Sequence, residues 1–218
     1  MVNRYLLGND WLLPKGEVIE IDLLTRDYKT VIVDISSFYA IDSGAQSNSF
    51  GSLEYELYRR DMLDYVHFLT NSITNGEPYF FTPKVFDEIQ INGKKYLRGK
   101  EPEEAKEIRT AKKFLKEAAE SNGNVLSYNY LTRQEVEVYE GLSQFYIDSS
   151  LKKISSADLE CLLTGAVLSE TGNPTALISN DWGIRNCWRE ILIYLDSDFD
   201  RLGFFSRRVA FPYLNREE

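Results

Sequence analysis

The stretch that decides the fold is residues 30–35, which read TVIVDI. The run is β-branched and apolar on both faces, as a central parallel strand covered by helices requires. Asp34 closes this apolar run. In open α/β sheets, ligands bind beyond the carboxyl ends of the strands. The stretch therefore predicts a central strand with an acidic residue at its functional end.

Outside this strand, short apolar runs alternate with segments of helical periodicity. Further strands are predicted at 79–82, 175–179 and 191–194, with an edge strand within 204–218. Helices are predicted over 53–69, from Pro83, from Pro102 to near Gly123, after Thr132 and after Ser155. Strands separated by long helices predict an α/β sandwich with a mainly parallel sheet. We expect one domain over residues 1–218, with a core at about 29–195 and short extensions at both ends.

Composition narrows the possible functions. The 218 residues carry 25 Lys plus Arg and 34 Asp plus Glu, and a net charge of −9 disfavours a general polycation-type nucleic-acid binder. His67 is the only histidine, which excludes histidine-rich zinc sites and paired-histidine ribonuclease catalysis. Two cysteines are too few for a disulfide scaffold, and no segment approaches the length of a membrane span. We therefore expect a cytoplasmic protein without membrane contact.

Four acidic residues fall where function is expected in such a fold. Two directly follow predicted strands and two lie early in predicted helices: Asp34 and Asp181, and Glu88 and Asp158. If the four converge, their repulsion needs a compensating charge, and Mg²⁺ or Mn²⁺ selects oxygen ligands. One or two such ions would activate a water and neutralise phosphate charge, which makes phosphodiester hydrolysis the expected reaction.

Four motifs in this order resemble those of PIN-domain nucleases: VIVDISSFY at 31–39, FTPKVFDEI at 81–89, SSADLECLLTGAV at 155–167 and TALISNDWGI at 175–184. The resemblance covers roughly residues 29–195. It implies a three-layer α/β/α sandwich with a mainly parallel central sheet, and the activity of a metal-dependent endoribonuclease. It also implies that the four acidic residues are both catalytic residues and metal ligands: Asp34, Glu88, Asp158 and Asp181.

The resemblance further implies supporting polar groups, either Ser36 or Ser37 and either Asn180 or Ser179. Of these, Ser36 and Asn180 are expected to contact substrate. Family members often carry a second acid two residues after the aspartate of the last motif, whereas this chain has Gly183. That departure leaves open whether one metal ion or two would bind.

A basic segment from Lys94 to Lys116 goes against the acidic balance of the chain. It holds nine basic and four acidic residues, a local charge of +5 that could contact a phosphate backbone. The residues expected to bind RNA are Lys94, Lys95, Arg109 and Lys112. The alternative is a solvated helix face with charge pairs four residues apart. Two tryptophans, Trp182 and Trp188, are interpreted as core residues rather than as base-stacking platforms.

Structural alternatives exist for two of the acidic residues, and functional alternatives for the whole chain. Asp158 has capping-box spacing from Ser155, and Asp181 could close an Asx-type turn. The leading hypothesis is an Mg²⁺- or Mn²⁺-dependent ribonuclease for single-stranded RNA, acting alone, as a homodimer or with a regulatory protein partner. The second is a catalytically degenerate PIN-like scaffold that binds RNA or a protein. An aspartate-nucleophile phosphatase ranks lower, because Ser36 stands where a second aspartate is needed.

Overall fold

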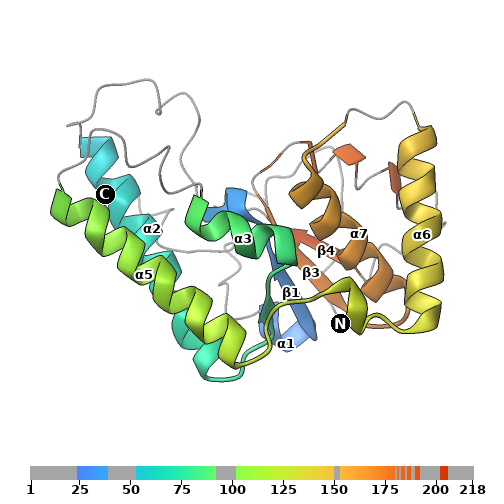
Figure 1. Cartoon of the computed structure of the whole chain (residues 1–218), viewed down its shortest axis with the longest axis horizontal. Coiled ribbons are helices and arrows are strands. Elements are labelled where there is room, and N and C mark those ends of the chain that lie inside the picture. Colours follow the sequence, from blue (N-terminus) through green and yellow to red (C-terminus); the bar gives the residue numbers. More distant parts are fainter. Residues whose placement is uncertain are drawn as a thin grey trace.

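The fold is built on a small, entirely parallel sheet (Figure 1). A computed structural model describes residues 24–38, 53–91, 102–149, 153–179, 181, 183, 184, 186, 187, 190, 191 and 202–205. Within them the strand order is β2-β1-β3-β4. The strands are β1 (Thr30–Val33), β2 (Tyr79–Phe80), β3 (Thr175–Ile178) and β4 (Leu202–Phe205). The molecule is therefore a mixed α/β protein with an open parallel sheet, as the alternation of strands and helices predicts.

Three of the predicted strands and the C-terminal edge strand are confirmed, and one prediction is wrong. The edge strand β4 begins two residues before Phe204. The strand predicted at 191–194 is not formed at its first residue, because Ile191 is helical and fully buried. Residues 192–194 lie outside the described residues. A short apolar run does not distinguish a buried strand from a buried helical turn, which explains the error.

The order of the strands places a reversal of chain direction at the carboxyl edge of the sheet. From the central β1 the chain passes to β2 on one side, and then to β3 on the other. Val33 of β1 is in register with Ile178 of β3, and the amide of Asp34 donates to the Ile178 carbonyl at 3.0 Å. Asp34 and Ser179 therefore leave the sheet side by side. This is the topological switch point, where parallel α/β sheets bind ligands.

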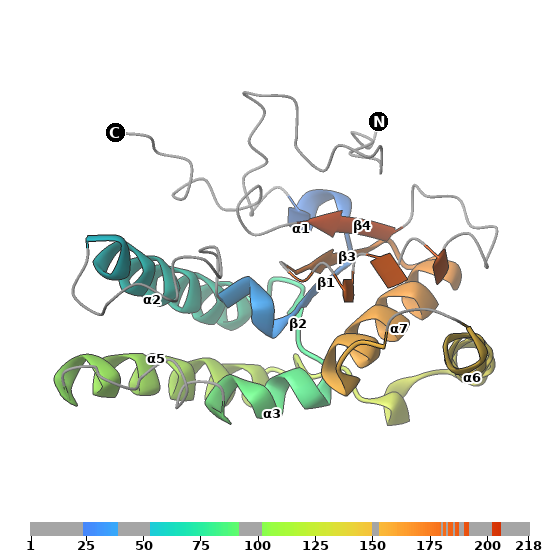
Figure 2. The ribbon, with the colours of Figure 1, turned by 90° about the horizontal axis from the view of Figure 1, so that it is seen from above.

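Helices account for most of the described chain. They are α1 (Leu24–Asp27), α2 (Leu53–Thr74), α3 (Pro83–Ile91), α5 (Pro102–Ser121), α6 (Arg133–Asp148) and α7 (Ser156–Glu170), with 3-10 turns η2 (Ile35–Phe38) and η4 (Tyr128–Tyr130). Helix α7 packs on β1 and β3, α6 packs on α7, and α2 packs along α5. Figure 2 shows α7 and α6 on one side of the strands and α2 on the other. None of the described helices has the length and apolarity needed to cross a membrane.

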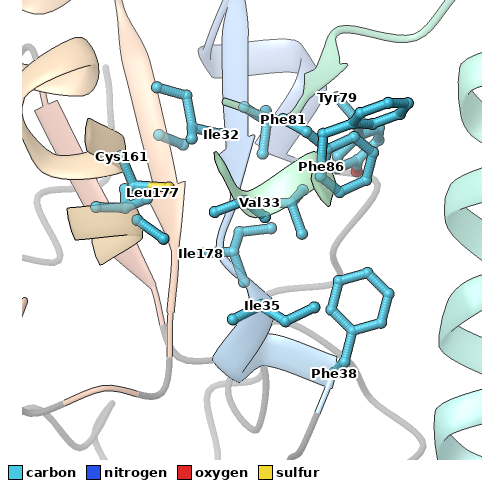
Figure 3. Packing of buried hydrophobic residues seen from close by; sticks show 14 of the residues in the cluster. Ile32, Val33, Ile35, Phe38, Tyr79, Phe81, Phe86, Cys161, Leu177 and Ile178 are labelled. Carbon is cyan, nitrogen blue, oxygen red and sulfur yellow. The ribbon is translucent and has the colours of Figure 1, made fainter. Parts of the chain in front are cut away.

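The core is centred on β1, β3 and α7. All four residues of β1 and of β3 are buried. Figure 3 shows Ile32 and Val33 of β1 packed with Leu177 and Ile178 of β3 and with Cys161 of α7. Helix α7 is apolar on nearly all sides, and it is buried between the sheet and α6. Its N-terminus, which carries Asp158, is therefore held in a fixed position relative to the ends of the strands.

The predicted helix starts and stops are present. Thr132 with Glu135, and Ser155 with Asp158, both form complete capping boxes. Gly172 follows α7 with φ +91°, in the left-handed region that only glycine adopts at low cost. After this turn the chain enters β3.

Replacing Gly172 by alanine should destabilise the protein, because a Cβ disfavours the left-handed conformation by about 1 kcal/mol. Gly141 provides a matched control with the opposite sign. It is exposed within α6, and an added Cβ there meets nothing within 4 Å. Gly141→Ala should raise the free energy of unfolding by about 0.5–1 kcal/mol. Urea unfolding measures both changes, and a stabilising Gly172→Ala would contradict the assigned turn.

Candidate functional site

Asp34 is the fully buried centre of the candidate site. Its Oδ2 accepts hydrogen bonds from the Ser36 hydroxyl, from the Ser36 amide at 3.3 Å and from the Ser179 hydroxyl at 2.7 Å. Its Oδ1 is also buried, and it has no hydrogen-bond partner in the described structure. A buried carboxylate oxygen without a donor is costly when the group is ionised. The described residues therefore provide hydrogen bonds to only one of the two oxygens of the Asp34 carboxylate.

The structure resolves one choice between supporting serines. Ser36 bonds to the Asp34 carboxylate, whereas the Ser37 hydroxyl donates to the Asp34 carbonyl at 2.6 Å and receives a bond from Tyr65 at 3.2 Å. Ser37 therefore stabilises the η2 turn. From the end of β3, Ser179 contacts Asp34 directly. Asn180, the alternative to Ser179, lies outside the described residues.

Asp158 and Asp181 each use one carboxylate oxygen to hold a local turn. Oδ2 of Asp158 accepts from the Ser155 amide at 3.2 Å. Oδ1 of Asp181 accepts from the amides of Gly183 and Ile184, the latter at 3.3 Å. The capping box at Asp158 and the turn at Asp181, which are the structural alternatives to metal binding, are thus both present. The other oxygen of each carboxylate accepts no hydrogen bond from the described residues, so the turns leave it available to a cation.

Electrostatics link these three acidic residues. The pKa of Asp34 is raised from 3.8 to about 7, mainly by burial and also by the charge of Asp158, while the hydrogen bonds from Ser36 and Ser179 oppose the shift. Burial also raises the pKa of Asp158, with a contribution from the charge of Asp181 and opposition from Ser155. Asp34, Asp158 and Asp181 therefore share one electrostatic environment. We call them the carboxylate triad.

Glu88, the fourth predicted ligand, is not among the charges that raise these pKa values. It is half-buried on α3, whereas the adjacent Asp87 is exposed. Helix α3 packs on η2 and α7, and so lies next to the turns that carry Asp34 and Asp158. Among the described residues, no group of three His, Cys, Asp or Glu side chains is arranged to hold a metal ion. The four-carboxylate metal centre stays a prediction.

Gly183 has a structural reason. A Cβ at this position would lie 2.8 Å from Oδ1 of Asp181 and 2.9 Å from a side-chain carbon of Ile154. Both contacts are shorter than real Cβ atoms make, so a side chain here would displace Asp181 or its neighbour. The missing side chain permits the bond from the Gly183 amide to Asp181. Glycine at this position therefore supports the geometry of Asp181.

The basic segment is only partly described, and one of its predicted RNA contacts is placed elsewhere. Lys94 and Lys95 lie outside the described residues, and Arg109 is exposed on α5. Lys112 is only 3% exposed, with its ammonium 6.0 Å from the ring centroid of Phe38. It lies on the buried face of α5 and not on a solvated helix face, and its expected contact with RNA stays a prediction. The chain's helical phase explains this, since apolar Ile108 and Ala111 share that buried face.

The alternative interpretation of the basic segment is present in one place. Lys113 and Glu117 form an exposed ion pair at 3.4 Å, four residues apart on α5. Such pairs contribute little to stability. The two tryptophans interpreted as core residues, Trp182 and Trp188, lie outside the described residues.

Comparison with known proteins adds no relative. No family model, no curated protein and no solved structure matches the chain.

The stability of the metal-free protein should decrease as the pH rises from about 4 to about 7. In this window the unfolded chain has lost the Asp34 proton, whereas the folded protein retains it, so the unfolded state binds fewer protons. The shift corresponds to about 4 kcal/mol, all of it lost by the time the pH exceeds the folded pKa. Urea unfolding at pH 5 and pH 8 in EDTA should differ by about 2.5 kcal/mol, because the first part of the loss occurs below pH 5.

Asp34→Asn should remove most of this pH dependence, because the amide has no proton to lose. Asp87→Asn is the matched control, since Asp87 is exposed on α3. Its pH profile should follow that of the wild type. Parallel profiles for the wild type and Asp34→Asn would show that Asp34 does not titrate as described.

Proposed function

We propose that the protein is an Mg²⁺- or Mn²⁺-dependent, PIN-like endoribonuclease that acts on single-stranded RNA. The observation that carries the proposal is Oδ1 of Asp34, a buried carboxylate oxygen without a hydrogen-bond partner in the described structure. It lies at the topological switch point of a parallel sheet, in the electrostatic environment of two further aspartates. Such a group needs either a proton or a cation.

The donor set suits a hard divalent cation. Each member of the triad has one oxygen held by local hydrogen bonds and a second that accepts none from the described residues. Carboxylate oxygens are the ligands that Mg²⁺ and Mn²⁺ prefer. Asp34, Asp158 and Asp181 would hold the ion, and Glu88 is the candidate for a further ligand from α3. When bound, the ion would supply a Lewis acid that neutralises phosphate charge and activates a water for hydrolysis.

The chain's own residues prepare this site before any ion arrives. Ser36 and Ser179 fix Oδ2 of Asp34, and this determines the direction of Oδ1. The capping box at Ser155 fixes Asp158, and the Gly183 amide fixes Asp181. Ligands held by neighbouring hydrogen bonds lose little conformational entropy on binding.

The finer fold assignment belongs to the same proposal. A three-layer α/β/α sandwich is supported by α7 and α6 on one side of the strands and α2 on the other (Figure 2). In this arrangement Asp34 and Ser179 lie at the carboxyl edge of β1 and β3.

A specific observation favours a second candidate, a PIN-like scaffold that binds RNA or a protein partner without cutting. Glu88 does not contribute to the raised pKa values of Asp34 and Asp158, and no metal-ready group of side chains is found among the described residues. Under this alternative, Asp34 stays protonated and the triad binds no ion.

Cleavage of a 5′-labelled single-stranded RNA in Mn²⁺ tests the nuclease directly. The wild type and the exposed-acid control Asp87→Asn should cut at equal rates. Asp34→Asn should fall to the level seen in EDTA, because the central ligand is lost. Equal activity of Asp34→Asn and the wild type would overturn the proposed site.

Thermal unfolding against metal concentration separates the nuclease from the scaffold. At pH 7.5, Mn²⁺ at 100 times its Kd should stabilise the wild type by about 2.7 kcal/mol, since only the folded state offers the site. Asp34→Asn should respond far less to the metal, because the central ligand is lost. It should stay folded, because the neutral amide avoids the cost of burying a charge. A wild type that binds RNA but shows no change in Tm with Mn²⁺ or Mg²⁺ would favour the scaffold.

A further inference from the structure

The three aspartates of the carboxylate triad come from three separate segments, so their spacing depends on contacts between those segments. Asp34 and Asp181 are joined by Ser179, whose hydroxyl donates to Oδ2 of Asp34 at 2.7 Å and accepts from the Asp181 amide at 3.0 Å. Among the described residues, the side chain of Asp158 is hydrogen-bonded only to Ser155, at the start of its own helix. A different contact must therefore fix Asp158 relative to Asp181.

Ile154 contacts the segments that carry both of these aspartates. It directly precedes Ser155, the N-cap of α7, so its backbone leads into the capping box of Asp158. Its side chain lies against the turn at Asp181, since a Cβ on Gly183 would be only 2.9 Å from Cγ2 of Ile154. The amide of Gly183 is one of the two that hold Oδ1 of Asp181. The side chain of Ile154 therefore separates the start of α7 from the turn at Asp181.

Tyr146, near the end of α6, holds Ile154 in place. The phenol oxygen of Tyr146 accepts a hydrogen bond from the Ile154 amide at 2.8 Å, and this tyrosine is only 5% exposed. The ammonium of Lys153 donates to the Tyr146 carbonyl at 2.6 Å and lies 4.3 Å from the centroid of the Tyr146 ring. Two successive residues before α7 are thus attached to one buried residue of α6.

Helices α6 and α7 pack against each other, and contacts connect them at both ends. At one end the Thr171 hydroxyl, just after α7, lies 3.3 Å from Oε1 of Glu135 in the first turn of α6. At the other end the Ile154 amide, just before α7, donates to Tyr146. The bond at Tyr146 therefore fixes the start of α7, where Asp158 lies, relative to α6.

We propose that Tyr146 and Ile154 are positioning residues of the metal site: Tyr146 anchors Ile154, and Ile154 sets the spacing between the carboxylates of Asp158 and Asp181. The inference rests on the proposed function, because the spacing matters only if the two carboxylates share an ion. Mg²⁺ takes oxygen ligands at about 2.0–2.1 Å in near-octahedral geometry, so a displacement of about 0.5 Å in one of two carboxylates is enough to weaken its binding.

Isothermal titration calorimetry with Mn²⁺ at pH 7.5 tests the positioning role without any substrate. Tyr146→Phe keeps the ring and loses only the acceptor for the Ile154 amide. It should raise the Kd for Mn²⁺ about tenfold, the lower end of the effect of residues that support metal ligands. Ile154→Ala should do the same, because it removes the carbon that lies against Gly183. Ile154→Val keeps that carbon and should bind Mn²⁺ as the wild type does.

Thr132→Ala is the control for a loss of stability alone. It opens the capping box at the start of α6, about 20 Å along the helix from Tyr146 at 1.5 Å per residue. It should destabilise the protein about as much as Tyr146→Phe does, since each variant leaves a backbone amide without its side-chain acceptor. Its Kd for Mn²⁺ should equal that of the wild type. An equal rise in Kd for Thr132→Ala and Tyr146→Phe would show general destabilisation and overturn the positioning role.

Amide hydrogen exchange followed by NMR in EDTA tests the linkage without a metal. Tyr146→Phe should accelerate exchange at Ile154, which loses its acceptor, and also at Gly183, which the described contacts connect to Tyr146 through Ile154. Thr132→Ala should change neither rate. An unchanged rate at Gly183 in Tyr146→Phe would overturn the proposal.

The positioning role and the proposed metal site fail separately. If the wild type binds no Mn²⁺ while Tyr146→Phe accelerates exchange at Gly183, the metal site fails and the linkage through Ile154 stands. If the wild type binds Mn²⁺ and Tyr146→Phe binds it equally well, the metal site stands and the positioning role is wrong.

Discussion

The interaction on which the rest of the site depends is the burial of the Asp34 carboxylate at the end of β1. The strands β1 and β3 are covered on both faces, so the residue that follows β1 emerges where the chain excludes water. Two serines satisfy Oδ2 and none of the described residues satisfies Oδ1. A group in this condition is neutral or is compensated by a cation. The dependence of stability on pH follows from that single choice.

Capping and metal binding, which look like alternatives at Asp158 and Asp181, are compatible in three dimensions. A carboxylate has two oxygens, and each of these turns uses one of them. The local bond reduces the freedom of the side chain and thereby aims the second oxygen. Gly183 also helps to orient a carboxylate, because the absence of a side chain lets its amide approach Asp181. The local signal of a helix start therefore does not exclude a ligand role for the same carboxylate.

Much of the fold was predictable from sequence because its determinants are local. The β-branched run at 30–35 and the capping boxes at Thr132 and Ser155 each specify their own conformation. The incorrect predictions concern features that tertiary packing determines. Whether the run at Ile191 forms strand or helix, and whether Lys112 faces solvent, depends on what packs against them.

Parts of the site were also beyond sequence reasoning, for the same reason. The bond from Ser179 to Asp34 follows from the register that places Val33 beside Ile178, and no local pattern encodes that register. An acidic chain can bind a polyanion if its own charge is offset at the point of contact. A cation shared between the triad and a phosphate would meet that condition, because it does not require a broad basic surface.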